Sequence, residues 1–298
     1  MLRLLVINGL ENLPQELISE KISICIGCFD GLHKGHMSVV RTVIADNLLP
    51  VVLSINKSKS FRILNEQTKI ERLSSAGIKA IINIDLEEIR DLSPEQFYNM
   101  LVSNLNIKRI SIGYNFKFGK NAEGTPLMLR EHAKKKRIKM LVSAPVLYKN
   151  TPISSTRIRT AIMTGKIYDA NEMLSYPFSI DSVVRHGFER GRTIGIPTLN
   201  QFFKSGTVIP KHGVYAGTVT VENIKYKCVT NIGVRPTVNG TDANAETHII
   251  HFGGNLYGEY ISVYLIDYLR DEMHFDNLEE LKDAIEYDIE KAEQIIEL

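Results

Sequence analysis

The chain has 298 residues, which is long enough for two domains that each bury a core. Its 36 Lys and Arg residues nearly balance its 34 Asp and Glu residues, and this balance requires neither nucleic acid nor a membrane as a partner. No apolar run reaches membrane-spanning length, and the short apolar start before Glu11 fits a first strand better than a signal peptide. We therefore expect a cytoplasmic protein, and its charge is compatible with a small anionic substrate.

The three cysteines are an odd and sparse set, which argues against a disulfide framework. Cys25 and Cys28 form a Cys-x-x-Cys pair, but no second pair completes a four-sulfur metal site. Residues three apart in a strand are roughly 10 Å apart, beyond the ~7 Å Cα limit for a disulfide. We expect the cysteines to serve core packing, with oxidation of this pair as the alternative.

The first half of the chain, to about Leu147, alternates strand-like and helix-like runs, which is typical of a parallel α/β sheet. Strands are expected at 4–7, 22–26, 51–53, 80–82, 110–112 and 140–142, and helices at 37–48, 66–76, 94–104 and 126–136. Ser93 and Gln96 fit a capping box that opens the third of these helices. Because ligands bind at the carboxyl ends of strands in such sheets, the loops that follow the strands are the candidate sites.

One such loop runs from residue 27 to residue 36 and carries His33 and His36 among three glycines. The glycines permit tight turns and close approach of a ligand, and the helix expected after them places His36 near a helix N-terminus that favours anions. We expect both imidazoles to converge on a polyphosphate and to stabilise charge on its leaving group. Two surface histidines on a turn are the alternative for an isolated His-x-x-His.

The run His33-Lys34-Gly35-His36 resembles the loop of the His-x-Gly-His nucleotidyltransferases. The longer run from Gly27 to His36 resembles the prokaryotic bifunctional riboflavin kinase/FAD synthetase family. The resemblance implies a Rossmann-like α/β nucleotidyltransferase domain in which His33 and His36 are catalytic. It also implies that the loop binds ATP through four further residues, namely Gly27, Phe29, Asp30 and Gly35.

A second strand end, Gly113 to Lys120, brackets two aromatic residues and an amide between glycines. An ordinary aromatic-rich turn is the alternative. The run resembles the family's Gly-x-Asn-Phe-x-Phe-Gly loop, which implies that Asn115 contacts ATP and that Phe116 and Phe118 lie near the flavin.

The run Ile153 to Arg159 places hydroxyl side chains and two arginines at a helix start. Hydroxyls there are usually caps, but the arginines add positive charge that a cap does not require and that suits phosphate. The run resembles the family's Ile-Ser-Ser-Thr-x-x-Arg motif, which implies ATP binding by Ser155, Thr156 and Arg159. The basic run 132–139 is expected to be a solvated helix end, with a nucleic-acid patch as the alternative.

After a helix-like stretch from 159 to 174, short β-rich runs separated by turns indicate a small closed or nearly closed antiparallel barrel. Its strands are expected at 180–184, 214–221, 226–232, 247–252 and 260–266. Apolar residues at helical spacing from 278 to 298 predict a C-terminal amphipathic helix on the barrel. We accordingly divide the chain into domains 1–177 and 178–298.

The barrel begins with a glycine- and arginine-rich run from Gly187 to Asn200. It suits a flap over phosphates that is followed by magnesium ligands, although β-turns explain the glycines equally well. The run resembles the riboflavin kinase pattern Gly-Arg-x-x-Gly-x-Pro-Thr-Ala-Asn, with Leu199 in place of Ala. This implies ATP binding by Gly187 and Gly195, and Mg²⁺ binding by Thr198 and Asn200.

Glu246-Thr247-His248-Ile249 resembles the kinase's Glu-x-His-x strand, which implies that Glu246 is the base that deprotonates the ribityl hydroxyl. A surface strand glutamate is the alternative. Further family landmarks are present at 231–237, 256–258 and Arg270, and Arg270 is implied in flavin binding. The substrates would be ATP, riboflavin and FMN with Mg²⁺ as cofactor, in a monomer or weak homo-oligomer.

Two runs depart from the family pattern. Residues 54–59 replace a Phe-x-Pro-His-Pro stretch, which alters the flavin side; we expect Lys57 and Lys59 to be solvated, with contact to the FMN phosphate as the alternative. Ser182 replaces the first glycine of the kinase flap, where backbone must approach the nucleotide.

We expect FMN adenylylation to FAD by the first domain and riboflavin phosphorylation to FMN by the second. Three alternatives stay open at this point. The chain could be a single-activity FAD synthase whose barrel only binds flavin, a nucleotidyltransferase for another phosphorylated acceptor, or a non-catalytic flavin- or RNA-binding regulator.

Overall fold

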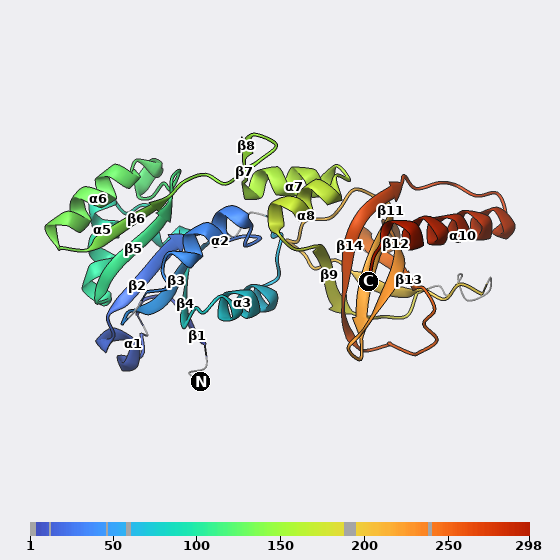
Figure 1. Ribbon diagram of the computed structural model, residues 1–298, viewed down its shortest axis with the longest axis horizontal. Coiled ribbons are helices and arrows are strands. Elements are labelled where there is room, and N and C mark those ends of the chain that lie inside the picture. The colour runs from blue at the N-terminus through green and yellow to red at the C-terminus, as the bar shows by residue number, and fades with distance from the viewer. Residues whose placement is uncertain (1–3, 12, 46, 58–60, 188–194, 238–239) are drawn as a thin grey trace. The chain divides into compact units, whose positions relative to one another are not determined.

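The computed structural model describes residues 4–11, 13–45, 47–57, 61–187, 195–237 and 240–298 (Figure 1). The chain forms two compact units, residues 1–154 and 155–298, called here the first and the second unit. In the described residues no helix is both long and apolar enough to cross a membrane. The helices between residue 155 and residue 174 belong to the second unit, and a functional domain boundary at Pro177 stays a prediction.

The first unit is built on a parallel six-stranded sheet with the order β1-β4-β3-β2-β5-β6. Its strands are β1 (Leu5–Asn8), β2 (Ile22–Gly27), β3 (Leu49–Asn56), β4 (Ala80–Asp85), β5 (Ile107–Gly113) and β6 (Lys139–Ser143). Its helices are α1 (Gln15–Ser19), α2 (Lys34–Arg41), α3 (Glu66–Ser75), α4 (Leu86–Ile89), α5 (Pro94–Asn104), the 3-10 turn η1 (Lys120–Ala122) and α6 (Pro126–Lys135). A small hairpin of β7 (Leu147–Tyr148) and β8 (Thr151–Pro152) follows. The predicted Rossmann-like α/β fold is confirmed.

The central strands of this sheet are apolar on both faces because helices cover both sides. The predicted capping box of α5 is confirmed, since Gln96 donates its backbone N–H to the Ser93 hydroxyl and accepts the Ser93 N–H in return. The helix predicted from 37 to 48 is wrong in its bounds, because α2 begins at Lys34 and ends at Arg41. Val43 continues the apolar spacing of the helix, but it is buried as part of a turn after α2, and Ile44 is half exposed.

The second unit is an antiparallel six-stranded sheet that curls into a nearly closed barrel, with the order β10-β13-β12-β11-β14-β9. Its elements are α7 (Ser155–Met163), α8 (Ile167–Leu174), β9 (Phe178–Val183), β10 (Leu199–Phe202), β11 (Gly213–Val221), β12 (Ile224–Thr237), β13 (Gly240–Ile249), β14 (Tyr260–Arg270) and α10 (Leu278–Ile295). The single helix expected before the barrel is two helices, because Gly165 takes a left-handed conformation, with φ of 76°, and ends α7. The predicted barrel is confirmed, although β10 was not among the predicted strands.

The barrel is closed by the hydrogen bonds of a buried side chain rather than by a complete ladder of backbone hydrogen bonds between the two edge strands. Gln201 on the edge strand β10 donates its Nε2 to the carbonyls of Ser182 on β9 and Ile261 on β14, at 2.9 and 2.7 Å. The backbone N–H of Arg185 adds a bond of 2.9 Å to the Asn200 carbonyl. These contacts join the two edges of the sheet.

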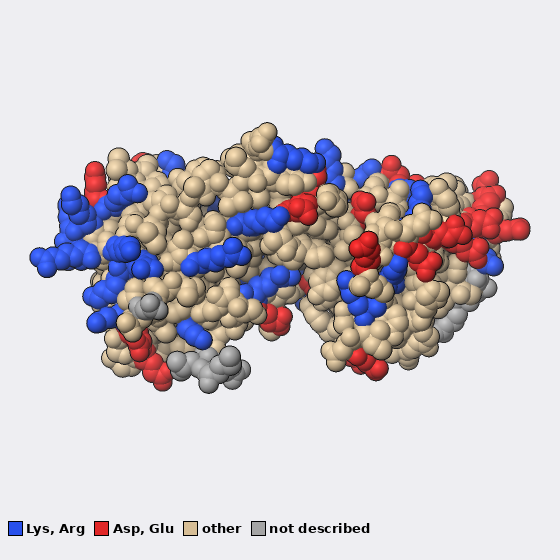
Figure 2. Space-filling view, in the orientation of Figure 1, with Lys and Arg blue, Asp and Glu red and all other residues tan. Residues whose placement is uncertain are grey.

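The C-terminal helix packs on the outer face of the barrel, as predicted. Ala292 and Ile296 form one apolar cluster with Val214, Ala216 and Val229, whose neighbours in the strands point into the barrel. Acidic side chains gather along α10, whereas Lys and Arg side chains are spread over the visible face of the first unit (Figure 2).

Candidate functional site

The first candidate site is the loop between β2 and α2. His33 is the N-cap of α2, and its Nδ1 accepts a hydrogen bond from the backbone N–H of His36 at 3.1 Å. The two imidazole rings are stacked, with centroids 3.6 Å apart and planes 17° apart. The structure therefore brings both predicted histidines together at a helix N-terminus, where backbone N–H groups and the helix dipole favour an anion.

Both histidines are uncharged at neutral pH. Burial lowers the pKa of His33 to about 4. Burial also lowers the pKa of His36, with smaller contributions from the adjacent His33 imidazole and from the charge of Lys69. Because Nδ1 of His33 is the acceptor, the neutral ring carries its hydrogen on Nε2 and can donate it to a ligand. Nδ1 of His36 is buried and has no hydrogen-bond partner among the described residues.

The other loop residues maintain this arrangement. A Cβ at Gly35 would lie 3.1 Å from atoms of the His33 ring, so the glycine permits the histidine stack. Phe29 takes a positive φ of 48° and is held there by burial of its ring, which contacts His36 edge-on. Asp30 accepts the backbone N–H of Ile63 at 2.9 Å. Contact of these residues and Gly27 with ATP stays a prediction.

The second predicted loop follows β5, which lies next to β2 in the sheet. Asn115 is exposed at this end of the strand, where a polar ligand could reach it. Phe116 stacks on Phe118, and Phe118 is buried against Phe97. Both aromatic residues belong to the core packing, and their proximity to a flavin stays a prediction.

The third motif begins a helix, as predicted. Ser155 is the first residue of α7, and Thr156 and Arg159 lie in its first two turns. The carbonyl of Ile153, the first residue of the motif, lies 3.9 Å from the position that a Cβ on Gly35 would take. The end of the first unit therefore passes beside the histidine loop.

The fourth site lies on the barrel, where Asn200 of β10 stands directly opposite Glu246 of β13. The side chains of facing residues lie on the same side of a sheet. Asn244 donates its Nδ2 to Oε1 of Glu246 at 3.2 Å and to Oδ1 of Asn200 at 3.5 Å. Asn244 was not among the predicted residues, because one asparagine in a polar strand has no distinguishing pattern.

These residues fit a magnesium ion by their chemistry. Thr198, Asn200 and Glu246 offer hydroxyl, amide and carboxylate oxygens, the donors that Mg²⁺ prefers. Oδ1 of Asn200 accepts one hydrogen bond from Asn244, and its second lone pair could bind a cation. The Gly187 backbone covers the Asn200 amide so closely that a Cβ would overlap it. Residues 188–194 of the predicted flap lie outside the described residues.

Thr198 also lines a pocket of about 300 Å³ in the second unit. Its walls include Val184, Phe252 and Tyr257, and the ring of Tyr257 stacks on His186 with centroids 3.8 Å apart. Gly195, which precedes the pocket residues Pro197 and Thr198 in the chain, has a positive φ of 80°. Apolar walls beside exposed peptide groups are suited to a planar ring system.

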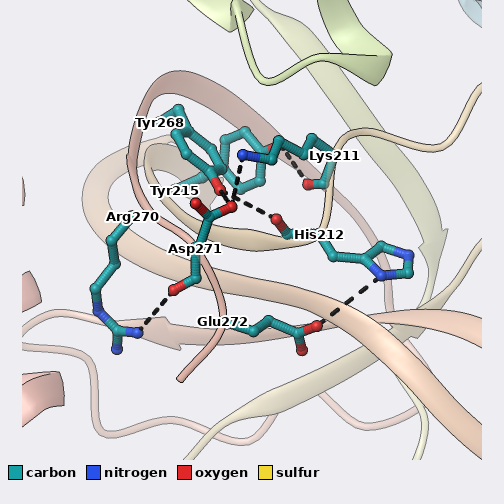
Figure 3. Close-up of polar contacts among 7 residues, drawn as sticks. All are labelled: Lys211, His212, Tyr215, Tyr268, Arg270, Asp271 and Glu272. Carbon is teal, nitrogen blue, oxygen red and sulfur yellow. Dashed lines mark hydrogen bonds and ion pairs between the residues drawn. The ribbon is translucent and has the colours of Figure 1, made fainter. Parts of the chain in front are cut away.

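Arg270 is held by other residues of the second unit (Figure 3). Its guanidinium donates two hydrogen bonds to Oδ2 of the buried Asp288 on α10, at 2.7 and 3.1 Å, and one to the Asp271 carbonyl at 3.1 Å. Asp271 in turn pairs with Lys211 and Tyr268. These contacts fix α10 on β14, and flavin binding by Arg270 stays a prediction.

Comparison with known proteins agrees with this geometry. Family models described as FAD synthetase and riboflavin kinase match residues 15–157 and 174–296. Proteins named bifunctional riboflavin kinase/FMN adenylyltransferase are similar over nearly the whole chain. The one from Buchnera aphidicola subsp. Schizaphis graminum is 33% identical over 98% of this chain and 99% of its own, and that from Bacillus subtilis is 31% identical over 94% and 95%. The chain belongs to this family.

The family fold also appears among solved structures. A crystal structure of a protein named macrolide-efflux protein from Streptococcus pneumoniae superposes with a TM-score of 0.88 at 29% identity, covering 97% of this chain and 99% of that one. Membership in the bifunctional riboflavin kinase/FMN adenylyltransferase family confirms the resemblance drawn from the histidine loop and from the strand of Glu246.

Proposed function

We propose that this chain carries out two ATP-dependent steps of FAD synthesis, phosphorylation of riboflavin by the predicted domain 178–298 and adenylylation of FMN by the predicted domain 1–177. Stacking of His33 and His36 at the N-terminus of α2 supports adenylyl transfer, since it is an arrangement for polyphosphate. The facing pair of Asn200 and Glu246 supports the kinase step, since it joins a candidate metal ligand to a candidate base.

For FAD formation, we infer that a phosphate oxygen of FMN attacks the α-phosphorus of ATP and that pyrophosphate leaves. His33 donates from Nε2, and with His36 and the N–H groups of α2 it stabilises the charge that builds on the leaving group. The loop residues Gly27, Phe29, Asp30 and Gly35 would shape the ATP site. Asn115, Ser155, Thr156 and Arg159 would bind phosphates. Positioning and electrostatics carry such a step, so no covalent intermediate with the enzyme is expected.

In the kinase step, the γ-phosphoryl group of ATP passes to the terminal ribityl hydroxyl of riboflavin, and Glu246 accepts the proton. Thr198 and Asn200 would hold Mg²⁺, which when bound neutralises charge on the phosphates. Gly187 and Gly195 would adjoin these phosphates. The pocket of about 300 Å³ beside Thr198 would take the planar base of the nucleotide.

One observation favours retention of the kinase activity despite the departure at Ser182. This residue follows the alternating pattern of β9 that turns Phe178 and Ile180 inward, and only 8% of it is exposed. Its side chain is therefore buried inside the second unit, where the added Cβ does not obstruct a nucleotide at the surface. Cytoplasmic location, a monomeric or weakly associated state and the absence of nucleic-acid partners stay predictions.

The test is chromatographic separation of flavins after incubation of the full chain with ATP and Mg²⁺. From riboflavin we expect FMN and then FAD. His33→Ala/His36→Ala should stop FAD formation and preserve FMN formation from riboflavin. Glu246→Gln should stop FMN formation from riboflavin and preserve FAD formation from supplied FMN. FAD formation that survives the double histidine variant would overturn the proposed adenylyl site. Riboflavin left unconverted by the unaltered chain would overturn the kinase assignment alone.

A further inference from the structure

The first unit contains a lysine that the proposed mechanism does not use. Lys69 on α3 is only 5% exposed, and its Nζ donates to Oγ of Ser54 at 2.6 Å. In the described part of the chain, its other partner is a Glu66 carboxylate oxygen at 3.9 Å, which is too far for a hydrogen bond. An ammonium has three N–H donors, and lysine is rarely buried unless it is paired. The site of Lys69 therefore has unused donor capacity.

The position of this ammonium is at the nucleotide-binding edge of the sheet. Ser54 lies near the carboxyl end of β3 and pairs in register with Gly27, where the histidine loop begins. The charge of Lys69 acts on His36, whose pKa it helps to lower after the larger effect of burial. Lys69 thus lies within electrostatic reach of the catalytic loop.

The surroundings of Lys69 do not fully compensate its charge. Burial lowers its pKa, and this effect outweighs the opposing attraction of Glu66 and Asp30. Asp30 is anchored to the backbone of Ile63, and the Glu66 side chain is 40% exposed. A buried cation with distant carboxylates gains free energy when an anion reaches it.

The topology indicates which anion this is. The elements that we assign to ATP follow β2 and β5, whereas Ser54 lies near the carboxyl end of β3, on the opposite side of β2. An acceptor that attacks the α-phosphorus of ATP would approach from the side that ATP leaves open. We propose that Lys69 binds the phosphate group of FMN in the adenylyl transfer site and that Ser54 is its partner while FMN is absent. This inference rests on the proposed function.

The test uses the full chain and varies FMN at saturating ATP. Lys69→Met keeps the length of the side chain and removes its charge, so we expect the KM for FMN to rise by about 10- to 100-fold, as for loss of a charged hydrogen bond. The KM for ATP should change less than threefold. Lys69→Arg keeps the charge and should recover part of the loss.

Two further variants separate binding from folding. Ser54→Ala removes only the partner of the unliganded state, so the KM for FMN should not rise. Lys108→Met removes an exposed lysine of β5 and should leave both KM values within twofold. The rate at which the same samples form FMN from riboflavin shows whether the second unit is intact.

An unchanged KM for FMN in Lys69→Met would overturn the inference. So would parallel loss of ATP and FMN binding in both Lys69→Met and Ser54→Ala, because that pattern indicates a structural pair. If Lys69→Met does not fold, Lys69→Arg and Ser54→Ala decide between the same two outcomes. Failure of the unaltered chain to convert FMN would instead count against the proposed function.

Discussion

Asn200 and Glu246 face each other across β10 and β13, and the amide of Asn244 donates to both. Asn200 and Asn244 are 3% and 5% exposed, so little water competes for these bonds. The amide oxygen that we assign to magnesium and the carboxylate that we assign to proton removal are therefore fixed relative to each other before substrate arrives.

Replacing Asn244 with Ala should slow FMN formation from riboflavin by about tenfold, because Glu246 loses a donor and Asn200 can rotate. Asn244→Asp should slow it further, because it places a like charge beside Glu246. FAD formation from FMN serves as the internal control and should not change. Steady-state rates for both reactions check this, and full kinase activity in Asn244→Ala would refute it.

The first unit should lose stability as the pH falls below about 6.5. The folded-state pKa of His33 is about 4, whereas an unfolded chain binds this proton near pH 6.5, so protons favour the unfolded state between these values. The free energy of unfolding should decrease by on the order of 3 kcal/mol across this window and be unaffected by His33 above it. Urea unfolding at several pH values measures the effect.

His33→Asn is the matched control for this pH dependence, because asparagine is also a good N-cap and does not titrate. Its stability should fall less steeply between pH 6.5 and pH 4, with the remaining slope due to His36 and other groups. An identical slope in both proteins would show that the His33 pKa is not lowered.

Arg270→Met should destabilise the second unit by about 3–5 kcal/mol, because it leaves the Asp288 carboxylate buried without its cation. The double variant Arg270→Met/Asp288→Leu should be much less affected, since neither charge remains. Denaturant unfolding of both variants gives the comparison. Equal losses in the single and double variants would mean that the pair does not hold α10.

Gln201→Leu should destabilise the barrel by about 1–3 kcal/mol for each carbonyl that it leaves without a donor. Thermal unfolding of the second unit checks this. The exposed Gln67→Leu on α3 is the control and should have little effect. A barrel that keeps its stability without Gln201 would show that the Arg185 bridge alone closes it.

Local patterns predicted much of the fold. The α/β alternation, the capping box at Ser93 and the amphipathic α10 each depend on residues close together in the chain. The closure of the barrel could not be predicted this way, because Gln201 bonds to Ile261, 60 residues away. The predicted bounds of α2 were wrong because the spacing of apolar residues does not distinguish a buried turn from a further turn of helix.

The same distinction applies to the candidate sites. His33 and His36 stand three residues apart in a glycine-rich run before a helix, and this local context predicted that they converge. Lys69 resembles any charged residue of an amphipathic helix, and only its burial against Ser54 sets it apart. The position of Asn244 beside Asn200 and Glu246 depends on the register of β13 with β10, which no local pattern specifies.

The closed arrangement of the barrel also affects self-association. Exposed edge strands offer unpaired backbone groups to other chains and promote aggregation. In the second unit, β9 and β10 meet through Gln201 and the Arg185 bridge, so these edges are not available as templates for strand addition. The risk of edge-to-edge pairing should therefore be concentrated at the outer strands of the parallel sheet, β1 and β6.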